Sequence, residues 1–142
     1  MNMNERFMYT SLPTTSQQLE GYLYRNATKF LGTKMGDEKI GKFPNRASYL
    51  INIGPKSSGG THWTTLHRAG NTALYYDPIG MPPPQVIYDS LRAKGLNIIM
   101  STNQHQDPRQ EIDQTCGQRA VRMIVMLSNS DDPESIIKEL CD

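Results

Sequence analysis

The alternation of hydrophobic and polar residues divides the first third of the chain into a helix, a loop and a strand. Residues 14–32 repeat apolar positions at helical spacing, which predicts a helix that Gly32 ends. Its apolar stripe consists of Leu19, Tyr22, Leu23, Ala27 and Phe30. Residues 32–45 are mostly polar and predict a loop, whereas the apolar run 48–53 predicts a strand.

Two β-rich runs in the middle of the chain predict a hairpin. Residues 62–68 (HWTTLHR) and 72–77 (TALYYD) are separated by Ala69-Gly70-Asn71. A Gly-Asn pair is a common two-residue connection between antiparallel strands. We therefore take Gly70 and Asn71 as the central residues of the turn, which fixes the register of the two strands.

This register brings a histidine and an aspartate together. His62 falls opposite Ile79, and Asp77 becomes its diagonal neighbour on the same face of the hairpin. Such diagonal positions are about 7–8 Å apart at the backbone, within reach of two polar side chains. Pro78 favours an extended Asp77 and ends the strand. The carboxylate is thus predicted to orient the imidazole.

The last third of the chain alternates between helices and one strand. Residues 84–95 predict a helix that starts with a proline and stops at Gly95, and residues 96–102 predict a buried strand. After the polar loop 103–114, Cys116 opens a helix, and residues 131–140 predict a last short helix. The predicted packed face of the Cys116 helix consists of Gly117, Ala120, Val121, Ile124 and Leu127.

Length and composition predict one domain over residues 1–142, with residues 1–13 as an N-terminal arm. The 15 basic and 14 acidic residues give a charge of +1, which does not favour a general nucleic-acid binder. No apolar run approaches the roughly 18 residues of a membrane span. We therefore expect no membrane association, and because the first residues lack a signal sequence we expect no secretion.

The two cysteines and three histidines limit the chemistry further. Two cysteines cannot form a disulfide framework, so a reducing compartment is expected. The cysteines and histidines are not at zinc-ligand spacing, and we expect neither a metal nor another cofactor. His67 and His105 are expected to be exposed polar residues, and Cys141 an incidental surface thiol.

Three residues in a fixed order carry the candidate chemistry: His62 in GGTHW, Asp77 in YYDPIG and Cys116 in TCG. A thiol at a helix N-terminus and beside an imidazolium has a lowered pKa and reacts as a thiolate. Alone, each residue has an ordinary structural explanation, as a core cysteine, a packed histidine or a turn aspartate. Together they predict a cysteine nucleophile, its base and the orienter of that base.

A cysteine hydrolase also needs donors for the oxyanion. The backbone N–H of Cys116 is one candidate, and a glutamine side chain from the preceding loop is the second. That loop contains Gln104, Gln106, Gln110 and Gln114. Trp63 is expected to lie beside the imidazole and exclude water, and Gly117 to lie next to the nucleophile.

The motifs GGTHW, YYDPIG and TCG resemble the adenain-like cysteine proteases, above all those of virophages, large DNA viruses and Maverick-type transposons. The resemblance extends over residues 15–127. It implies an α+β fold with a small central mixed sheet flanked by helices and the cysteine at the start of a buried helix, as also in proteases of ubiquitin-like modifiers. It implies Cys116 as nucleophile, His62 as base and Asp77 as orienter.

The resemblance leaves the glutamine open. Relatives place it six or seven residues before the cysteine, which fits Gln110 at six, whereas position 109 is an arginine. The alternative is Gln106, which requires a short insertion before the cysteine. Both remain candidates for the oxyanion hole.

The function that the resemblance implies is that of a cysteine endopeptidase that processes viral capsid or virion precursor proteins after small residues such as glycine. Its partners would be these structural proteins, and its location the virion or the cytoplasmic viral factory of the host cell. Because the chain is shorter than adenain, activation by a peptide or by DNA is not carried over. Alternatives are a protease of ubiquitin-like modifiers and a non-catalytic virion protein on the same fold.

Overall fold

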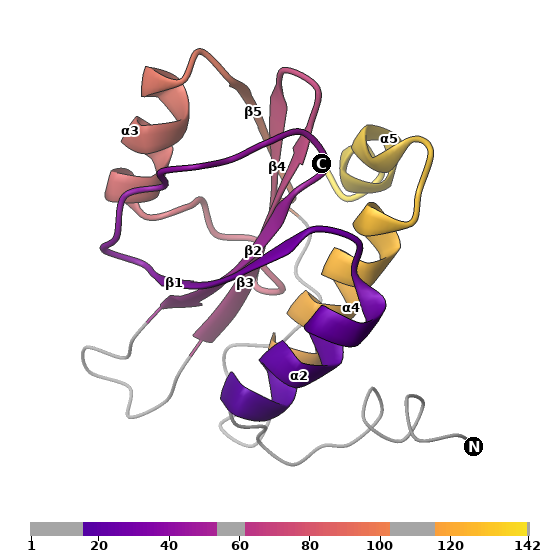
Figure 1. Cartoon of the computed structure of the whole chain (residues 1–142). Coiled ribbons are helices and arrows are strands. Elements are labelled where there is room, and N and C mark those ends of the chain that lie inside the picture. Colours follow the sequence, from indigo (N-terminus) through magenta and orange to yellow (C-terminus); the bar gives the residue numbers. More distant parts are fainter. Residues whose placement is uncertain (1–15, 54–61, 103–115, 142) are drawn as a thin grey trace.

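The computed structural model describes residues 16–53, 62–102 and 116–141. In this part of the chain, four helices surround a mixed sheet of five strands, an α+β arrangement (Figure 1). The proposed arm (residues 1–13) and the polar loop before Cys116 lie outside the described residues. The elements are α2 (Ser16–Asn26), β1 (Phe30–Met35), β2 (Ser48–Ile53), β3 (His62–Ala69), β4 (Thr72–Tyr76), α3 (Gln85–Ala93), β5 (Asn97–Met100), α4 (Cys116–Ser128) and α5 (Pro133–Lys138).

The strands lie in the sheet in the order of the sequence, β1-β2-β3-β4-β5. The outer pairs β1–β2 and β4–β5 are parallel, and the inner pairs β2–β3 and β3–β4 are antiparallel. The predicted hairpin is confirmed: Ala69 pairs with Thr72 and Thr65 with Tyr76, as a turn centred on Gly70 and Asn71 requires. Gly70 has φ +62°, a conformation that glycine adopts without strain.

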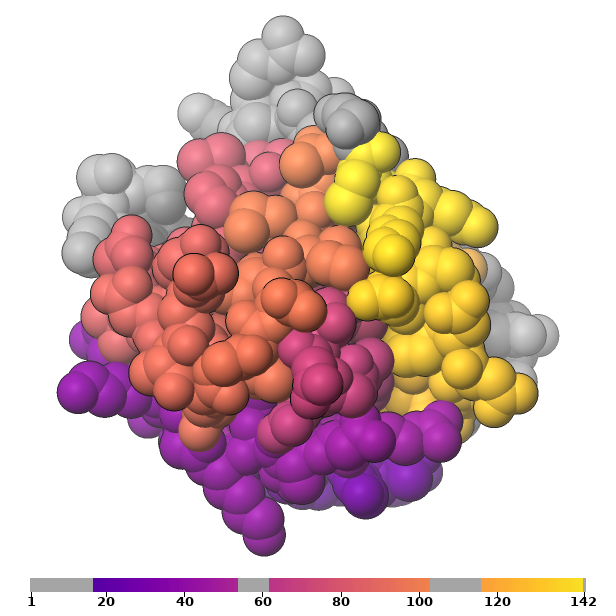
Figure 2. Space-filling view, turned by 90° about the horizontal axis from the view of Figure 1, so that it is seen from above, coloured from indigo at the N-terminus to yellow at the C-terminus, as the bar shows by residue number. Residues whose placement is uncertain are grey.

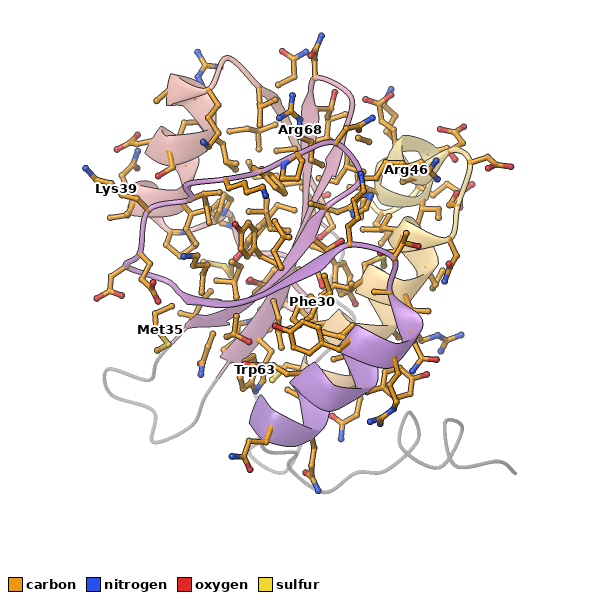
Figure 3. All side chains as sticks on the ribbon, viewed as in Figure 1. Phe30, Met35, Lys39, Arg46, Trp63 and Arg68 are labelled. Atoms are coloured by element: carbon orange, nitrogen blue, oxygen red, sulfur yellow. The ribbon has the colours of Figure 1, made fainter. Side chains whose placement is uncertain are left out.

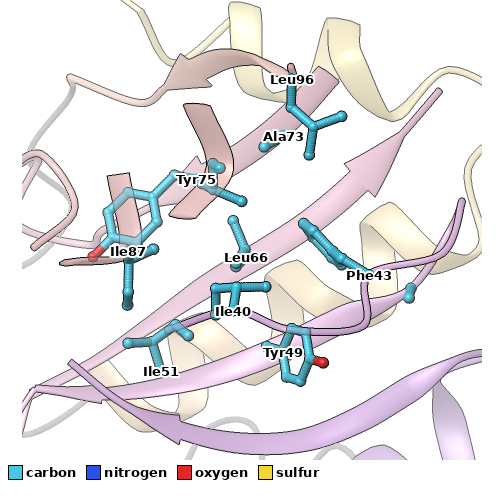
Figure 4. Close-up of a cluster of buried hydrophobic side chains, with 11 residues drawn as sticks. Ile40, Phe43, Tyr49, Ile51, Leu66, Ala73, Tyr75, Ile87 and Leu96 are labelled. Carbon is cyan, nitrogen blue, oxygen red and sulfur yellow. The ribbon is translucent and has the colours of Figure 1, made fainter. Parts of the chain in front are cut away.

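Two apolar layers cover the two faces of the sheet. On one face, α3 and the segment after β1 pack on Tyr49, Ile51, Leu66 and Tyr75 (Figure 4). On the other face, α2 and α4 pack on β2 and β3, and α5 packs with α4 on β4. This second layer matters for function because it brings α4, which begins at Cys116, onto the strand that begins at His62.

The prediction of one helix over residues 14–32 is wrong in its second half. The helix α2 ends at Asn26, whose side-chain amide donates to the Tyr22 carbonyl at 2.8 Å, and Phe30 already begins β1. Phe30 and Leu31 belong to β1, which pairs in parallel with β2 and continues to Met35, so the predicted loop over residues 32–45 is wrong at its start. Gly32 lies inside β1, with φ +116°, where the pairing shifts register. Pairing with β2 therefore decided the conformation of Phe30 and Leu31, although the sequence predicts a helix there.

The remaining predicted elements are found, with one difference in burial. The helices α3, α4 and α5 form where expected, and the Asp132 carboxylate accepts from the Ser135 N–H at the start of α5. The strand β5 was expected to be buried, but Asn97 is exposed and the next three residues are half-buried because β5 is an edge strand. No helix of the described segments is long and apolar enough to cross a membrane.

The two ends of the hairpin formed by β3 and β4 lie at opposite ends of the sheet. At the end of the molecule seen in Figure 2, the β3–β4 turn lies between the α3–β5 segment and α5. The opposite end of β3 and β4 carries His62 and Asp77, because the two strands are antiparallel. The candidate chemistry therefore lies at the end of the sheet away from the hairpin turn.

Candidate active site

The hairpin positions the histidine and the aspartate for a direct contact. His62 is the first residue of β3, and Asp77 follows the last residue of β4. The His62 Nε2 and Asp77 Oδ1 atoms are 2.7 Å apart, the length of a charge-assisted hydrogen bond. The structure therefore brings the predicted imidazole and carboxylate into contact.

The Asp77 carboxylate is buried and held by its own turn. Residues 77–80 form a tight turn in which the Gly80 N–H donates to the Asp77 carbonyl at 2.8 Å. The same Oδ1 atom that contacts His62 also accepts from the Ile79 N–H at 2.8 Å. The Asp77 N–H donates to the Ser101 hydroxyl, at the end of β5. These bonds fix the carboxylate, which is 1% exposed, before any ligand binds.

The thiol completes the group. Cys116 is the first residue of α4 and is buried, and its side chain takes part in a hydrogen bond with the His62 ring. Because Nε2 of His62 is engaged by Asp77, the ring nitrogen that faces the sulfur is Nδ1. The sulfur therefore lies at the N-terminus of a helix, which carries a partial positive charge.

The pKa of His62 reflects these neighbours. Burial by itself would lower it, but the hydrogen bonds to Asp77 and Cys116, and the negative charges of both, raise the pKa from 6.5 to about 9. At neutral pH the ring is therefore an imidazolium between a carboxylate and the sulfur. The His62 side chain is 22% exposed, so one edge of the ring is open to solvent.

Trp63 packs behind the cysteine. Its side chain is 6% exposed and projects from the start of β3 toward α2 and α4, in the cluster that contains Cys116 and Ala120 (Figure 3). On the same face of β3, the buried Thr65 hydroxyl donates to the Ala120 carbonyl of α4 at 2.6 Å. The strand of the base and the helix of the thiol are thus joined by apolar packing and by a buried hydrogen bond.

Other predicted residues have mixed outcomes. Gly117 is buried in the first turn of α4, next to the thiol. The glutamine candidates Gln106 and Gln110 lie outside the described residues, so the choice between them stays a prediction. Cys141 is exposed, as expected, and its sulfur donates to the Met100 carbonyl. Gln118, a buried polar residue two positions after the thiol, was not singled out because nothing in the local pattern marks it.

The expectation that His67 is an exposed polar residue is wrong. His67 is 1% exposed and its Nδ1 atom lies 2.6 Å from the Ser48 hydroxyl of β2. Burial, and secondly the positive charge of Arg46, lower the pKa of His67 to about 4. It lies on the face of β3 opposite to that of His62, as the strand alternation predicts, and it pairs with Ser48 of β2. His105 lies outside the described residues.

Comparisons with known proteins add no assignment. No protein-family model matches the chain, and no curated protein matches its sequence.

Proposed function

We propose that the protein is a cysteine endopeptidase. The observation that supports this most directly is that a single imidazole, His62, bonds both the buried Asp77 carboxylate and the Cys116 thiol at the start of a helix. A thiol, an imidazole and a carboxylate in this order are the minimal set for nucleophilic catalysis by cysteine.

The chemistry follows from the protonation states. The Cys116 thiolate attacks the carbonyl carbon of a peptide bond, and the oxyanion that forms is stabilised by the N–H groups at the start of α4. The His62 imidazolium donates its Nδ1 proton to the departing amine, which leaves a thioester on the cysteine. The neutral imidazole then accepts a proton from a water molecule that hydrolyses the thioester. Asp77 stabilises the imidazolium in both half-reactions.

The substrates that we propose are viral capsid or virion precursor proteins, cut after a small residue such as glycine. The support for this part is the resemblance of GGTHW, YYDPIG and TCG to the corresponding motifs of adenain-like proteases. The proposed place of action is the virion or the viral factory of the host cell.

A panel of peptides tests the endopeptidase activity and distinguishes it from that of a protease of ubiquitin-like modifiers. Purified protein is incubated with peptides that contain internal Gly-Gly or Gly-x bonds, and with a fluorogenic substrate that ends in the C-terminal sequence of a ubiquitin-like modifier. Cleavage of the internal bonds, lost in C116A and retained in C141A, is expected. Cleavage of the modifier substrate alone would point to the second group of proteases. If no peptide is cut and an electrophile labels Cys116 no faster than the exposed Cys141, the protein is not a cysteine protease.

A further inference from the structure

A buried hydrogen bond links the two elements that carry the thiol and its base. The Thr65 hydroxyl in β3 donates to the Ala120 carbonyl in α4, with 2.6 Å between the oxygens. Both residues are fully buried. Thr65 lies three residues after His62, about 10 Å along a strand, and Ala120 lies four residues after Cys116, about 6 Å along a helix. The bond is therefore close to the reacting pair on both elements.

Helix formation does not require this bond. In an α-helix, the carbonyl of residue 120 already accepts the N–H of residue 124, and α4 continues to Ser128. A valine would fill the same volume as Thr65, whose neighbours include Leu50 and Ala120 of the apolar cluster between the sheet and α4. The hydroxyl thus adds a directional contact at a place where burial alone would be satisfied by a hydrocarbon side chain.

A directional contact matters because apolar packing alone allows small shifts of the helix at little cost in free energy. The contacts of Val121 and Ile124 with the sheet are non-directional, and at the far end of α4 an exposed bond joins Arg46 to the Ser130 carbonyl. A displacement of about 1 Å between reacting groups can reduce a rate by about 100-fold. A hydrogen bond in a dry interior is the contact best suited to prevent a slide of α4 along β3.

We infer that Thr65 is a positioning residue of the Cys116–His62 pair: its hydroxyl fixes α4 on β3 at the position in which the sulfur meets the imidazole. This inference rests on the proposed function, since the pair must be the reactive one. It assigns no contact between Thr65 and a substrate, because the residue is fully buried.

The test measures the pair itself and needs no substrate. In a C141S background, which leaves Cys116 as the single thiol, the rate of alkylation by iodoacetamide is followed from pH 4 to pH 10 for the parent, T65V and T65S. The matched control is T72V, at a buried threonine at the hairpin end of β4. Thermal unfolding followed by circular dichroism reports the stability of each variant.

We expect T65V to unfold within a few degrees of the parent but to react at pH 6.5 at no more than about a tenth of the parent's rate, because the sulfur no longer meets the imidazolium that activates it. T65S, which keeps the hydroxyl, and T72V should follow the parent profile. If T65V does not fold, T65S and T65A provide the same contrast, since both lack the methyl group and only one keeps the hydroxyl.

Two failures have different meanings. If the parent reacts as a thiolate at low pH and T65V has the same profile, the positioning role is overturned while the proposed activity stands. If Cys116 of the parent titrates as an ordinary thiol, the proposed activity fails, and the positioning role fails with it. A loss in T72V equal to that in T65V would also overturn the inference, because the effect would then follow from any buried threonine.

Discussion

Substitution of Asp77 by asparagine tests the electrostatics of the site most directly. Asparagine keeps the size of the side chain and an oxygen that can accept hydrogen bonds from the Ile79 N–H and the His62 Nε2–H. In the parent, the Asp77 Oδ1 atom lies 2.8 Å from the first nitrogen and 2.7 Å from the second. It removes the negative charge. The turn at residues 77–80 should therefore survive, and the change should act on the protonation of His62.

The structure gives the size of the effect. Burial lowers the pKa of His62, yet the bonds and charges of Asp77 and Cys116 raise it from 6.5 to about 9, with the hydrogen bond to Asp77 the largest of the raising causes. A tenfold change in protonation corresponds to about 1.4 kcal/mol, so the site stabilises the imidazolium by roughly 3 kcal/mol. With about half of this supplied by Asp77, D77N increases the ratio of neutral imidazole to imidazolium at a given pH by about tenfold.

The sign of the pH dependence follows from the raised pKa. A group whose pKa is higher in the folded protein stabilises the fold fully below pH 6.5, and this contribution is lost as the pH rises through about 9. The imidazolium of His62 should accordingly persist to about pH 9 in the parent. In D77N the imidazolium loses its proton at a lower pH, and the upper limit of peptide cleavage should move with it.

The assay is an NMR titration of histidine rings labelled at Cε1, combined with the alkylation rate of Cys116. The parent should give a His62 midpoint near pH 9, and D77N a lower one with an alkylation rate at pH 7 reduced by about tenfold. The matched control is D89N, at an exposed aspartate of α3 whose side chain accepts from Gln85. A His62 midpoint that is the same in D77N and the parent would refute the electrostatic argument.

Two further predictions concern the fold. Burial and the charge of Arg46 lower the pKa of His67 to about 4, so below pH 6.5 the unfolded chain binds a proton that the folded protein does not. The free energy of unfolding should therefore fall by up to about 3 kcal/mol between pH 6.5 and pH 4. Urea unfolding at both pH values should show a smaller loss for H67Q than for the parent, and an equal loss would contradict this account. G70A should lower the free energy of unfolding by about 1–2 kcal/mol through backbone strain alone, since the φ of Gly70 is +62° and no atom lies within 4 Å of an added Cβ. The control is G41A: an added Cβ at Gly41 also meets no atom, and Gly41 is not in the left-handed region, so this variant should unfold at the temperature of the parent.

Local chemistry made several parts of the site predictable. The Gly70-Asn71 turn fixed the register of the hairpin, and the register placed Asp77 within reach of His62. The residues of DPIG form the turn that holds the carboxylate, so an ordinary turn signal and a functional position coincide at Asp77. The start of α4 at Cys116 agreed with the apolar periodicity of the residues after it.

Features that depend on distant partners were missed. The segment Phe30–Met35 spans the end of the predicted helix and the start of the predicted loop, but it becomes a strand because β2 offers it a parallel partner. His67 looked like an exposed residue of a strand, but it is buried and bonds Ser48 of the neighbouring strand β2. The bond from Thr65 to Ala120 joins positions 55 residues apart, and no spacing in the sequence announces it.

The sequence by itself therefore determined the parts of this protein that arise within one turn, one hairpin or one helix, because a few neighbouring residues set the backbone angles there. The tertiary structure alone decided the meeting of the sulfur with the imidazole. That meeting depends on how a helix settles on a sheet, and this position is the sum of many small apolar contacts and a few buried polar bonds contributed by residues far apart along the chain.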